Sequence, residues 1–317
     1  MPDPKPAVGE VLLRVKAAAL NHLDLFLRSG ASTMPGFKLP HIGGFDVAGE
    51  IRAVGPGVDP KRVGEAVVVA SRVTGPQATS KLDMIGTARP GGYAELVAAP
   101  VQCLAPKPTN YSWEEAAAFG CVYLTAYCGL TVKAAVKPGE VVLVHAGGSG
   151  AGSAAVQVAK AAGATVITTV GSDEKCVKAK ELLRADYAVN YKTQDFREVV
   201  KDVTCGRGVD VVFDPVWGET AVKTLESLGF RSRWIVLGMV GGLKCLIDVS
   251  KLMFKEVSLL GLVEFYADEA QTAGAWAMAH RGIVRPIIAK TWPLAQLAEA
   301  QKQMERGDFF GKIVVVP

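Results

Sequence analysis

The stretch VHAGGSGAGSAAVQVAKAAG, residues 144–163, constrains the fold more than any other part of the chain. It continues an apolar run, VVLV, which has the length of a strand buried on both faces. Glycine and serine dominate residues 147–153, and an alanine-rich segment over 150–163 then predicts a helix. A helix that starts directly after such a loop presents unpaired amides and the positive end of its dipole to an anion. The order of strand, glycine loop and helix therefore indicates a pyrophosphate site.

The segments after this loop continue to alternate between strand and helix patterns. Strands are predicted at ATVITTV, YAVN, VDVVFD, RWIVLGM and EVSLLGLV, and helices at EKCVKAKELL, QDFREVVKDV and TAVKTLESL. Such alternation is typical of a doubly wound parallel sheet. Ser149 replaces the middle glycine of the G-x-G-x-x-G pattern, so the loop alone is also compatible with a purely structural turn. Together with the alternation, it predicts a dinucleotide site formed by Gly147, Ser149, Gly150, Ala151 and Gly152.

The next strand end carries no acidic residue. NAD-dependent enzymes usually place an acid about twenty positions after the loop, to hold the ribose hydroxyls. Here the strand ends at Val170, and Asp173 comes later, where a carboxylate can cap the next helix. Ser172 and Lys175 suit a 2′-phosphate, so we expect NADPH. The alternative is that Lys175 is an ordinary solvated helix lysine.

Composition limits the other function classes. The 317 residues predict two domains, and 50% hydrophobic with 21% charged residues is ordinary globular composition. The net charge of +4 comes without a basic run interleaved with aromatics, which argues against nucleic-acid binding. The six cysteines form no C-x-x-C pair, which indicates a reducing compartment. We expect a cytoplasmic protein without a signal peptide or a membrane-spanning segment.

Several stretches resemble the medium-chain dehydrogenase/reductase superfamily, specifically its zinc-independent quinone oxidoreductase branch. The matching pieces are AALNHLDLFLRSG, LPHIGGFDVAGEI, GGYAEL, AAAFGCVYLTAYCGL, VVLVHAGGSGAGSAAVQVAKAAGA, ADYAVNY, GVDVVFDPVWG and FGKIVVVP. The resemblance implies an α/β fold in which a Rossmann doubly wound parallel sheet, residues 122–263, is inserted in a GroES-like β-rich catalytic domain, residues 1–121 and 264–317. It also implies strands ahead of PDPKP, so we expect a shortened N-terminus.

The resemblance further places the positions of zinc ligands. Zinc members hold the catalytic metal with a Cys, a His and a second Cys or an acid. This chain has Asn21 at the first position, Phe45 followed by Asp46 at the second, and Cys121 at the third. The lobe at 71–92, which corresponds to a four-cysteine structural zinc site, contains no cysteine. One thiolate cannot make a site that needs three protein ligands, so we predict a metal-free protein.

Without a Lewis acid, oxidation of a simple alcohol lacks its alkoxide stabiliser. Reduction of a quinone or an α,β-unsaturated carbonyl requires only that nicotinamide and acceptor be held together with one or two hydrogen-bond donors. We therefore expect an NADPH-dependent quinone or enone oxidoreductase. The alternatives are an enoyl-thioester reductase and a low-turnover NADPH-binding protein with a structural or interaction role. The EVSLLGLV segment resembles the strand through which relatives pair, so we expect a homodimer.

By resemblance, the remaining cofactor contacts fall into two groups. The nicotinamide end would meet Asn21, Thr125, Gly238, Met239, Val240, Phe310, Gly311 and Lys312. The adenosine phosphate would meet Ser172, Lys175 and Tyr191.

Asn21, Asp24 and Tyr123 are the candidates for catalytic roles. Asp24 matches an acid that is frequent in the branch, and a salt bridge with Arg28 is the alternative for it. Tyr123 is the candidate for a substrate-facing hydroxyl, and a buried structural tyrosine is its alternative.

Overall fold

The computed structural model describes residues 3–31, 34–70, 72–73, 78 and 82–317. The chain divides into two compact units, one made of residues 1–121 with 285–317 and the other of residues 122–284. The first boundary falls where the sequence placed it, and the second lies at 284/285 instead of 263/264.

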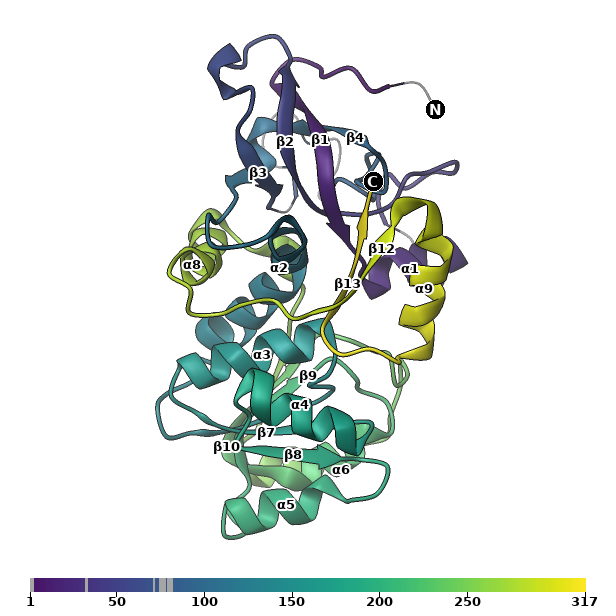
Figure 1. Ribbon diagram of the computed structural model, residues 1–317. Coiled ribbons are helices and arrows are strands. Elements are labelled where there is room, and N and C mark those ends of the chain that lie inside the picture. Colours follow the sequence, from purple (N-terminus) through teal and green to yellow (C-terminus); the bar gives the residue numbers. More distant parts are fainter. Residues whose placement is uncertain (1–2, 32–33, 71, 74–77, 79–81) are drawn as a thin grey trace. The chain divides into compact units, whose positions relative to one another are not determined.

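The first unit is built on a β-sheet that both ends of the chain share (Figure 1). Its strands are β1 (Glu10–Ala19), β2 (Asp46–Val54), β3 (Ala66–Val69), β4 (Leu96–Pro100), β5 (Leu104–Pro106), β12 (Ile288–Pro293) and β13 (Lys312–Val316). The order is β12-β13-β1-β2-β3-β5, with β4 also paired to β1. Strand β1 pairs antiparallel with β2, β4 and β13, so it joins the N-terminal and C-terminal segments of the chain.

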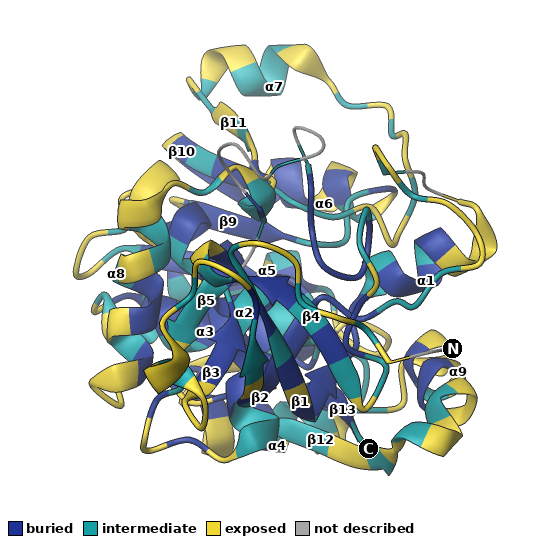
Figure 2. Ribbon diagram, turned by 90° about the horizontal axis from the view of Figure 1, so that it is seen from above, coloured by how far each residue is buried: buried dark blue, intermediate teal, exposed yellow. Residues whose placement is uncertain are grey.

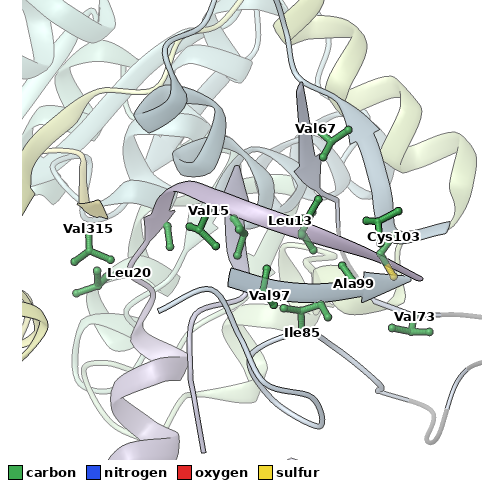
Figure 3. Packing of buried hydrophobic residues seen from close by; sticks show 14 of the residues in the cluster. Leu13, Val15, Leu20, Val67, Val73, Ile85, Val97, Ala99, Cys103 and Val315 are labelled. Atoms are coloured by element: carbon green, nitrogen blue, oxygen red, sulfur yellow. The ribbon is translucent and has the colours of Figure 1, made fainter. Parts of the chain in front are cut away.

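Alternation along β1 accounts for the core of this unit. Val11, Leu13 and Val15 are at most 3% exposed, whereas Arg14, on the other face, is exposed. Figure 3 shows Leu13 and Val15 beside Val97 of β4, in the buried cluster that supports the sheet.

The helices of this unit are α1 (His22–Ser29), α9 (Leu297–Arg306) and the first part of α2 (Trp113–Ala126). Helix α1 ends at Gly30, whose φ of 73° is a left-handed conformation that glycine adopts readily. Arg28 donates to Gln301 at 2.7 Å and also pairs with Glu305, both on α9. The alternative of a salt bridge between Asp24 and Arg28 is therefore wrong, because Arg28 is bound to α9.

The second unit contains a parallel sheet with the order β11-β10-β9-β6-β7-β8. Its strands are β6 (Val141–Val144), β7 (Thr165–Val170), β8 (Tyr187–Asn190), β9 (Val209–Asp214), β10 (Leu228–Val236) and β11 (Ser258–Gly261). This is the strand order of dinucleotide-binding sheets. Successive strands are added on one side of β6 as far as β8, and from β9 onward they are added on its other side. Ligands of such sheets bind beyond the carboxyl ends of the strands at that change of side, and the glycine loop directly follows β6.

Four helices connect these strands where the sequence predicts helices: α3 (Gly150–Ala161), α4 (Asp173–Leu183), α5 (Phe196–Val203) and α6 (Thr220–Ser227). Helix α7 (Val249–Phe254), between β10 and β11, was not predicted. Helix α3 packs beside α4 and against β6 and β7, whereas α5 packs beside α6 (Figure 1). The apolar strands β6 and β9 are buried between them.

Helix α8 (Glu269–His280) belongs to the second unit, although the sequence assigned it to the other domain. It packs on the π-helical continuation of α2, Tyr127–Lys133. A Cβ atom at Gly274 would lie 2.3 Å from the Tyr127 hydroxyl, so the two helices approach closely only because residue 274 is glycine. Cys128 Sγ also lies 3.9 Å from Gln271 Oε1. These contacts move the boundary to 284/285.

One described helix, Trp113–Lys133, is long and apolar enough to cross a membrane by length and composition, with a mean hydropathy of 1.3. The expectation of a protein without a membrane-spanning segment stays a prediction. In this window 67% of the residues are buried inside the protein, and buried core helices pass the same test.

Candidate functional site

The glycine loop after β6 makes two close backbone contacts. A Cβ atom at Gly147 would lie 2.1 Å from Thr168 Oγ1, and one at Gly152 would lie 2.0 Å from the Ala146 carbonyl oxygen. Any larger residue at these two positions would force the loop away from β7 or lift α3 from the loop. Both positions therefore need glycine for these close approaches.

Ser149 caps helix α3, because its hydroxyl accepts a hydrogen bond from Gly152 N at 3.0 Å. The amides of Gly150 and Ala151 open the same turn, and they have no protein acceptor within the described part of the chain. Both residues are partly exposed. Two unpaired amides at the positive end of a helix fit the pyrophosphate of a dinucleotide.

The three residues predicted for the adenosine phosphate follow two neighbouring strands, Ser172 and Lys175 after β7 and Tyr191 after β8. Ser172 caps α4 by accepting from Lys175 N at 3.2 Å, so its hydroxyl proton remains available to a ligand. Tyr191 is 56% exposed, and a Cβ atom at Gly171 would lie 3.1 Å from its hydroxyl oxygen. The Asp173 carboxylate accepts a hydrogen bond from Asn190 Nδ2 at 2.8 Å. The acid nearest to this corner is thus engaged by the protein.

The segment after β10 contains three further predicted cofactor residues. A Cβ atom at Gly238 would lie 2.2 Å from the Pro215 carbonyl oxygen, so the segments after β9 and β10 run close together. Met239 and Val240 follow, with 41% and 53% of their surface exposed. Both are available to a ligand, and their assignment to nicotinamide stays a prediction.

Two candidates on α2 are buried. Tyr123 is 2% exposed, and its hydroxyl accepts a hydrogen bond from Gln157 Nε2 on α3 at 2.8 Å. This contact is what the structural alternative expects, and a substrate-facing role for Tyr123 stays a prediction. Thr125 is 5% exposed, two residues further along the helix.

The first unit contains a buried polar network that we call the Asp46 cluster. It consists of the Leu20 carbonyl, the side chains of Asn21, Asp46 and Lys312, and the amide of Cys121. Asp46 accepts from Asn21 Nδ2 and from Cys121 N, each at 2.9 Å. The Lys312 ammonium donates to Asn21 Oδ1 at 2.7 Å, to the Leu20 carbonyl at 2.8 Å and to Asp46 at 3.3 Å. The Asp46 and Lys312 side chains are 3% and 5% exposed.

The three positions that the resemblance assigns to zinc ligands thus meet at the Asp46 carboxylate. Asp46 directly follows Phe45, and it accepts hydrogen bonds from the Asn21 side chain and from the Cys121 amide. The Lys312 ammonium bonds to Asn21 and Asp46. The donor set does not fit zinc, since Asn21 and Phe45 supply neither thiolate nor imidazole. No group of three His, Cys, Asp or Glu side chains that could hold a metal occurs among the described residues. The cation bonded to Asn21 and Asp46 is the chain's own Lys312.

Asp24 lies beside this cluster in the first turn of α1. Its carboxylate accepts hydrogen bonds from the Tyr93 hydroxyl at 2.7 Å, Asn21 N at 2.9 Å and Gly44 N at 3.2 Å. Burial raises the pKa of Asp24 to about 6, although these three bonds and the charge of Lys312 oppose the shift. The same burial and the adjacent Asp24 charge raise the pKa of Tyr93 well above its ordinary value.

The segment before β13 holds the last two predicted residues. Phe310 is 6% exposed. Gly311 has a φ of 100°, and a Cβ atom there would lie 2.2 Å from the Ile287 carbonyl oxygen, so this position requires glycine. The tight turn sets where the Lys312 side chain begins.

The sequence did not reveal two features of this site, the bond between Lys312 and Asp46 and the role of Tyr93. The bond between Lys312 and Asp46 joins residues 266 positions apart, and no local pattern signals it. Tyr93 was visible only as part of the GGYAEL piece. The clearest available signal for it is the pair Gly43 and Gly44, because the Tyr93 ring occupies the space that a Cβ atom at Gly44 would need.

Comparison with family models gives two matches. The model "Alcohol dehydrogenase GroES-like domain" matches residues 7–109, and the model "Zinc-binding dehydrogenase" matches residues 150–279.

The chain is also similar to proteins over its whole length. It is 30% identical to quinone oxidoreductase of Homo sapiens, covering 99% of this chain and 91% of that protein. It is 31% identical to 2-haloacrylate reductase of a Burkholderia species, covering 98% and 92%. A solved structure described as an NAD-dependent alcohol dehydrogenase superposes with a TM-score of 0.91 at 35% identity, covering 100% and 94%. These matches confirm the predicted fold class of a parallel α/β sheet with a GroES-like domain.

Proposed function

Because the chain belongs to the medium-chain dehydrogenase/reductase superfamily, in its quinone oxidoreductase-like branch, we propose that it is an NADPH-dependent, zinc-independent reductase of quinones or α,β-unsaturated carbonyls. Members of this superfamily are oxidoreductases that bind a nicotinamide cofactor. The choice of NADPH, the independence from zinc and the acceptor class are the proposed parts.

The Asp46 cluster is the observation that carries the proposal. Asn21 and Asp46 are bonded to Lys312, so their polar atoms are engaged within the protein. This donor set supplies no Lewis acid for an alkoxide. A conjugated acceptor does not need one, since the charge formed after hydride addition spreads to an oxygen that water can protonate.

The residues of the glycine loop would hold the cofactor. A bound reduced nicotinamide supplies a hydride. The Gly150 and Ala151 amides would bind the pyrophosphate, and Ser172 with Lys175 would bind the 2′-phosphate. Asn21, held by Lys312 and Asp46, has a fixed side chain that would keep one orientation toward the nicotinamide end.

The acceptor class is tested by following the absorbance of NADPH with quinones, 2-alkenals and crotonyl-CoA. We expect oxidation with the first two classes, unchanged after dialysis against a chelator. Faster turnover of crotonyl-CoA would instead support an enoyl-thioester reductase. Tight NADPH binding without oxidation by any acceptor would support a low-turnover binding protein. Stoichiometric zinc in protein purified without chelator would refute zinc independence.

The cofactor choice is tested by Lys175→Ala, with Lys178→Ala as the matched control on the same helix. Lys178 pairs with Glu174 at 2.6 Å and faces solvent. A charge-assisted hydrogen bond to phosphate is worth about 1.5–3 kcal/mol, so Lys175→Ala should weaken NADPH binding about tenfold or more. NADH binding should not change. Equal effects of the two variants, or a wild type that prefers NADH, would refute the phosphate assignment.

We also propose that the protein is a cytoplasmic homodimer that pairs through β11. This strand forms the edge of the parallel sheet, and Leu259 on it is 46% exposed. Figure 2 shows exposed surface along β11 and α7, where Phe254 is 76% exposed. All six cysteines are free thiols, which suits a reducing compartment. Sedimentation should give twice the chain mass, and Leu259→Glu should give a monomer. A monomeric wild type would refute the pairing.

A further inference from the structure

His145 lies at the end of β6, directly before the glycine loop, and is 1% exposed. Its Nδ1 atom lies 3.1 Å from Thr169 Oγ1 of β7, and its Nε2 atom lies 2.9 Å from Thr224 Oγ1 of α6. The Phe196 ring of α5 packs edge-on against it at 5.1 Å. Both nitrogens are thus hydrogen-bonded inside the second unit.

The hydrogen-bond partners determine which nitrogen carries the proton. The Thr224 hydroxyl donates to the Thr220 carbonyl at 2.9 Å, so its oxygen must accept from His145 Nε2–H. A neutral imidazole then leaves Nδ1 as an acceptor, and the Thr169 hydroxyl donates to it. Burial lowers the pKa of His145, and the carboxylate of Asp214 on β9 acts in the opposite direction. His145 is therefore neutral in the Nε2–H form.

Thr169 connects the His145 ring to the glycine loop. With its proton committed to His145, its oxygen accepts a hydrogen bond from Ala146 N at 3.2 Å. Ala146 has a φ of 54°, a left-handed conformation that is unfavourable for a residue with a side chain. Strained residues of this kind persist where surrounding contacts hold them. The Ala146 carbonyl in turn accepts from Ser149 N at 2.8 Å and contacts Gly152, so its conformation fixes the start of α3.

We propose that His145 is a positioning residue for the cofactor: through Thr169 it holds the strained Ala146 turn that aims the Gly150 and Ala151 amides at a pyrophosphate. We call this chain of groups, from Thr224 through His145 and Thr169 to the Ala146 amide, the His145 relay. This inference rests on the proposed function, because it assigns the loop to a dinucleotide. No atom of the relay has to touch the cofactor.

The two threonines provide a matched pair of variants. Thr169→Val and Thr224→Val each replace a buried threonine by a residue of the same shape, and each removes one hydrogen bond to His145. Only Thr169 also bonds to the loop. We expect Thr169→Val to weaken NADPH binding about tenfold, which corresponds to about 1.4 kcal/mol, and Thr224→Val, which leaves the bond between Thr169 and Ala146 in place but frees His145 Nε2, to weaken it by a smaller factor of about three. Thr169→Ser, which keeps the hydroxyl, should restore most of the affinity.

Two readouts do not depend on the cofactor. The ¹⁵N shifts of labelled histidine report which ring nitrogen of His145 is protonated, and Nε2–H is expected. Hydrogen exchange of the Ala146 amide should be much faster in Thr169→Val and slightly faster in Thr224→Val.

Wild-type dinucleotide affinity with wild-type exchange at Ala146 in Thr224→Val would overturn the inference and leave His145 a structural residue, because Thr169 alone would then hold the turn. An Nδ1–H form would also overturn it. If the wild type binds no dinucleotide, the proposed function fails, while the protonation state and the exchange rates still decide whether the relay holds the turn.

Discussion

The Asp46 cluster and the His145 relay are both buried polar networks, but the first carries charge and the second is neutral. Asp46 and Lys312 form an ion pair that is almost fully buried. The relay uses hydroxyl groups, a neutral imidazole and one backbone amide. Breaking a buried ion pair leaves an uncompensated charge, whereas breaking a neutral hydrogen bond leaves at most one unsatisfied dipole. The charged network should therefore govern the stability of its unit, and the neutral one mainly the geometry of its loop.

Lys312→Met should have the largest effect. It leaves the Asp46 carboxylate buried without its cation, and removal of one partner of a buried pair costs about 3–5 kcal/mol. Urea unfolding of the variant measures this cost. Lys16→Met is the control, because the ion pair of Lys16 with Glu50 is long, at 3.8 Å, and partly exposed.

The double variant Lys312→Met with Asp46→Asn should recover part of the loss, since it removes the unpaired charge. If Lys312→Met costs no more than Lys16→Met, the contrast between the two networks is wrong.

Asp24 lies between the two cases of the comparison, because it is a buried carboxylate whose three hydrogen-bond donors are all neutral. Its folded pKa of about 6 lies above the ordinary value of 3.8, so the folded state binds a proton in this window and the unfolded state does not. The free energy of unfolding should therefore fall by up to about 3 kcal/mol as the pH rises from about 4 to 6. Asp24→Asn should remove this slope in urea unfolding measured across the window.

Asp59→Asn is the control for this slope. Asp59 is exposed, and its side chain accepts only a local bond from Lys61 N. The variant should keep the pH dependence of the wild type. A slope that survives in Asp24→Asn would show that another group titrates there.

What could be predicted from the sequence depends on how far apart the interacting residues lie along the chain. The glycine loop and the helix that follows it depend on residues a few positions apart, and the structure contains both. The strands and helices that alternate along the second unit were predictable for the same reason, because each is recognised from the pattern of neighbouring residues.

The Asp46 cluster could not be predicted in this way. Its bond between Lys312 and Asn21 joins residues 291 positions apart, across a sheet that places β13 beside β1. The resemblance pointed to Asn21 and Phe45 as positions that lack metal ligands, but nothing local indicated which group would bind Asn21. The placement of α8 failed for a related reason, since it depends on Gly274 meeting Tyr127 in the folded unit.

Ser149→Ala should have the smallest effect. The Ser149 hydroxyl satisfies one amide at the start of α3, and loss of such a cap typically costs about 1 kcal/mol, whereas a glycine cap costs only a few tenths. Ser149→Gly, which also completes the glycine pattern, should therefore be more stable than Ser149→Ala in thermal unfolding. Both should lose far less than Lys312→Met, because the helix start is partly exposed and water can replace the hydroxyl. If Ser149→Ala lowered the free energy of unfolding as much as Lys312→Met, the neutral contacts of the glycine loop would govern the stability of the second unit, contrary to the comparison.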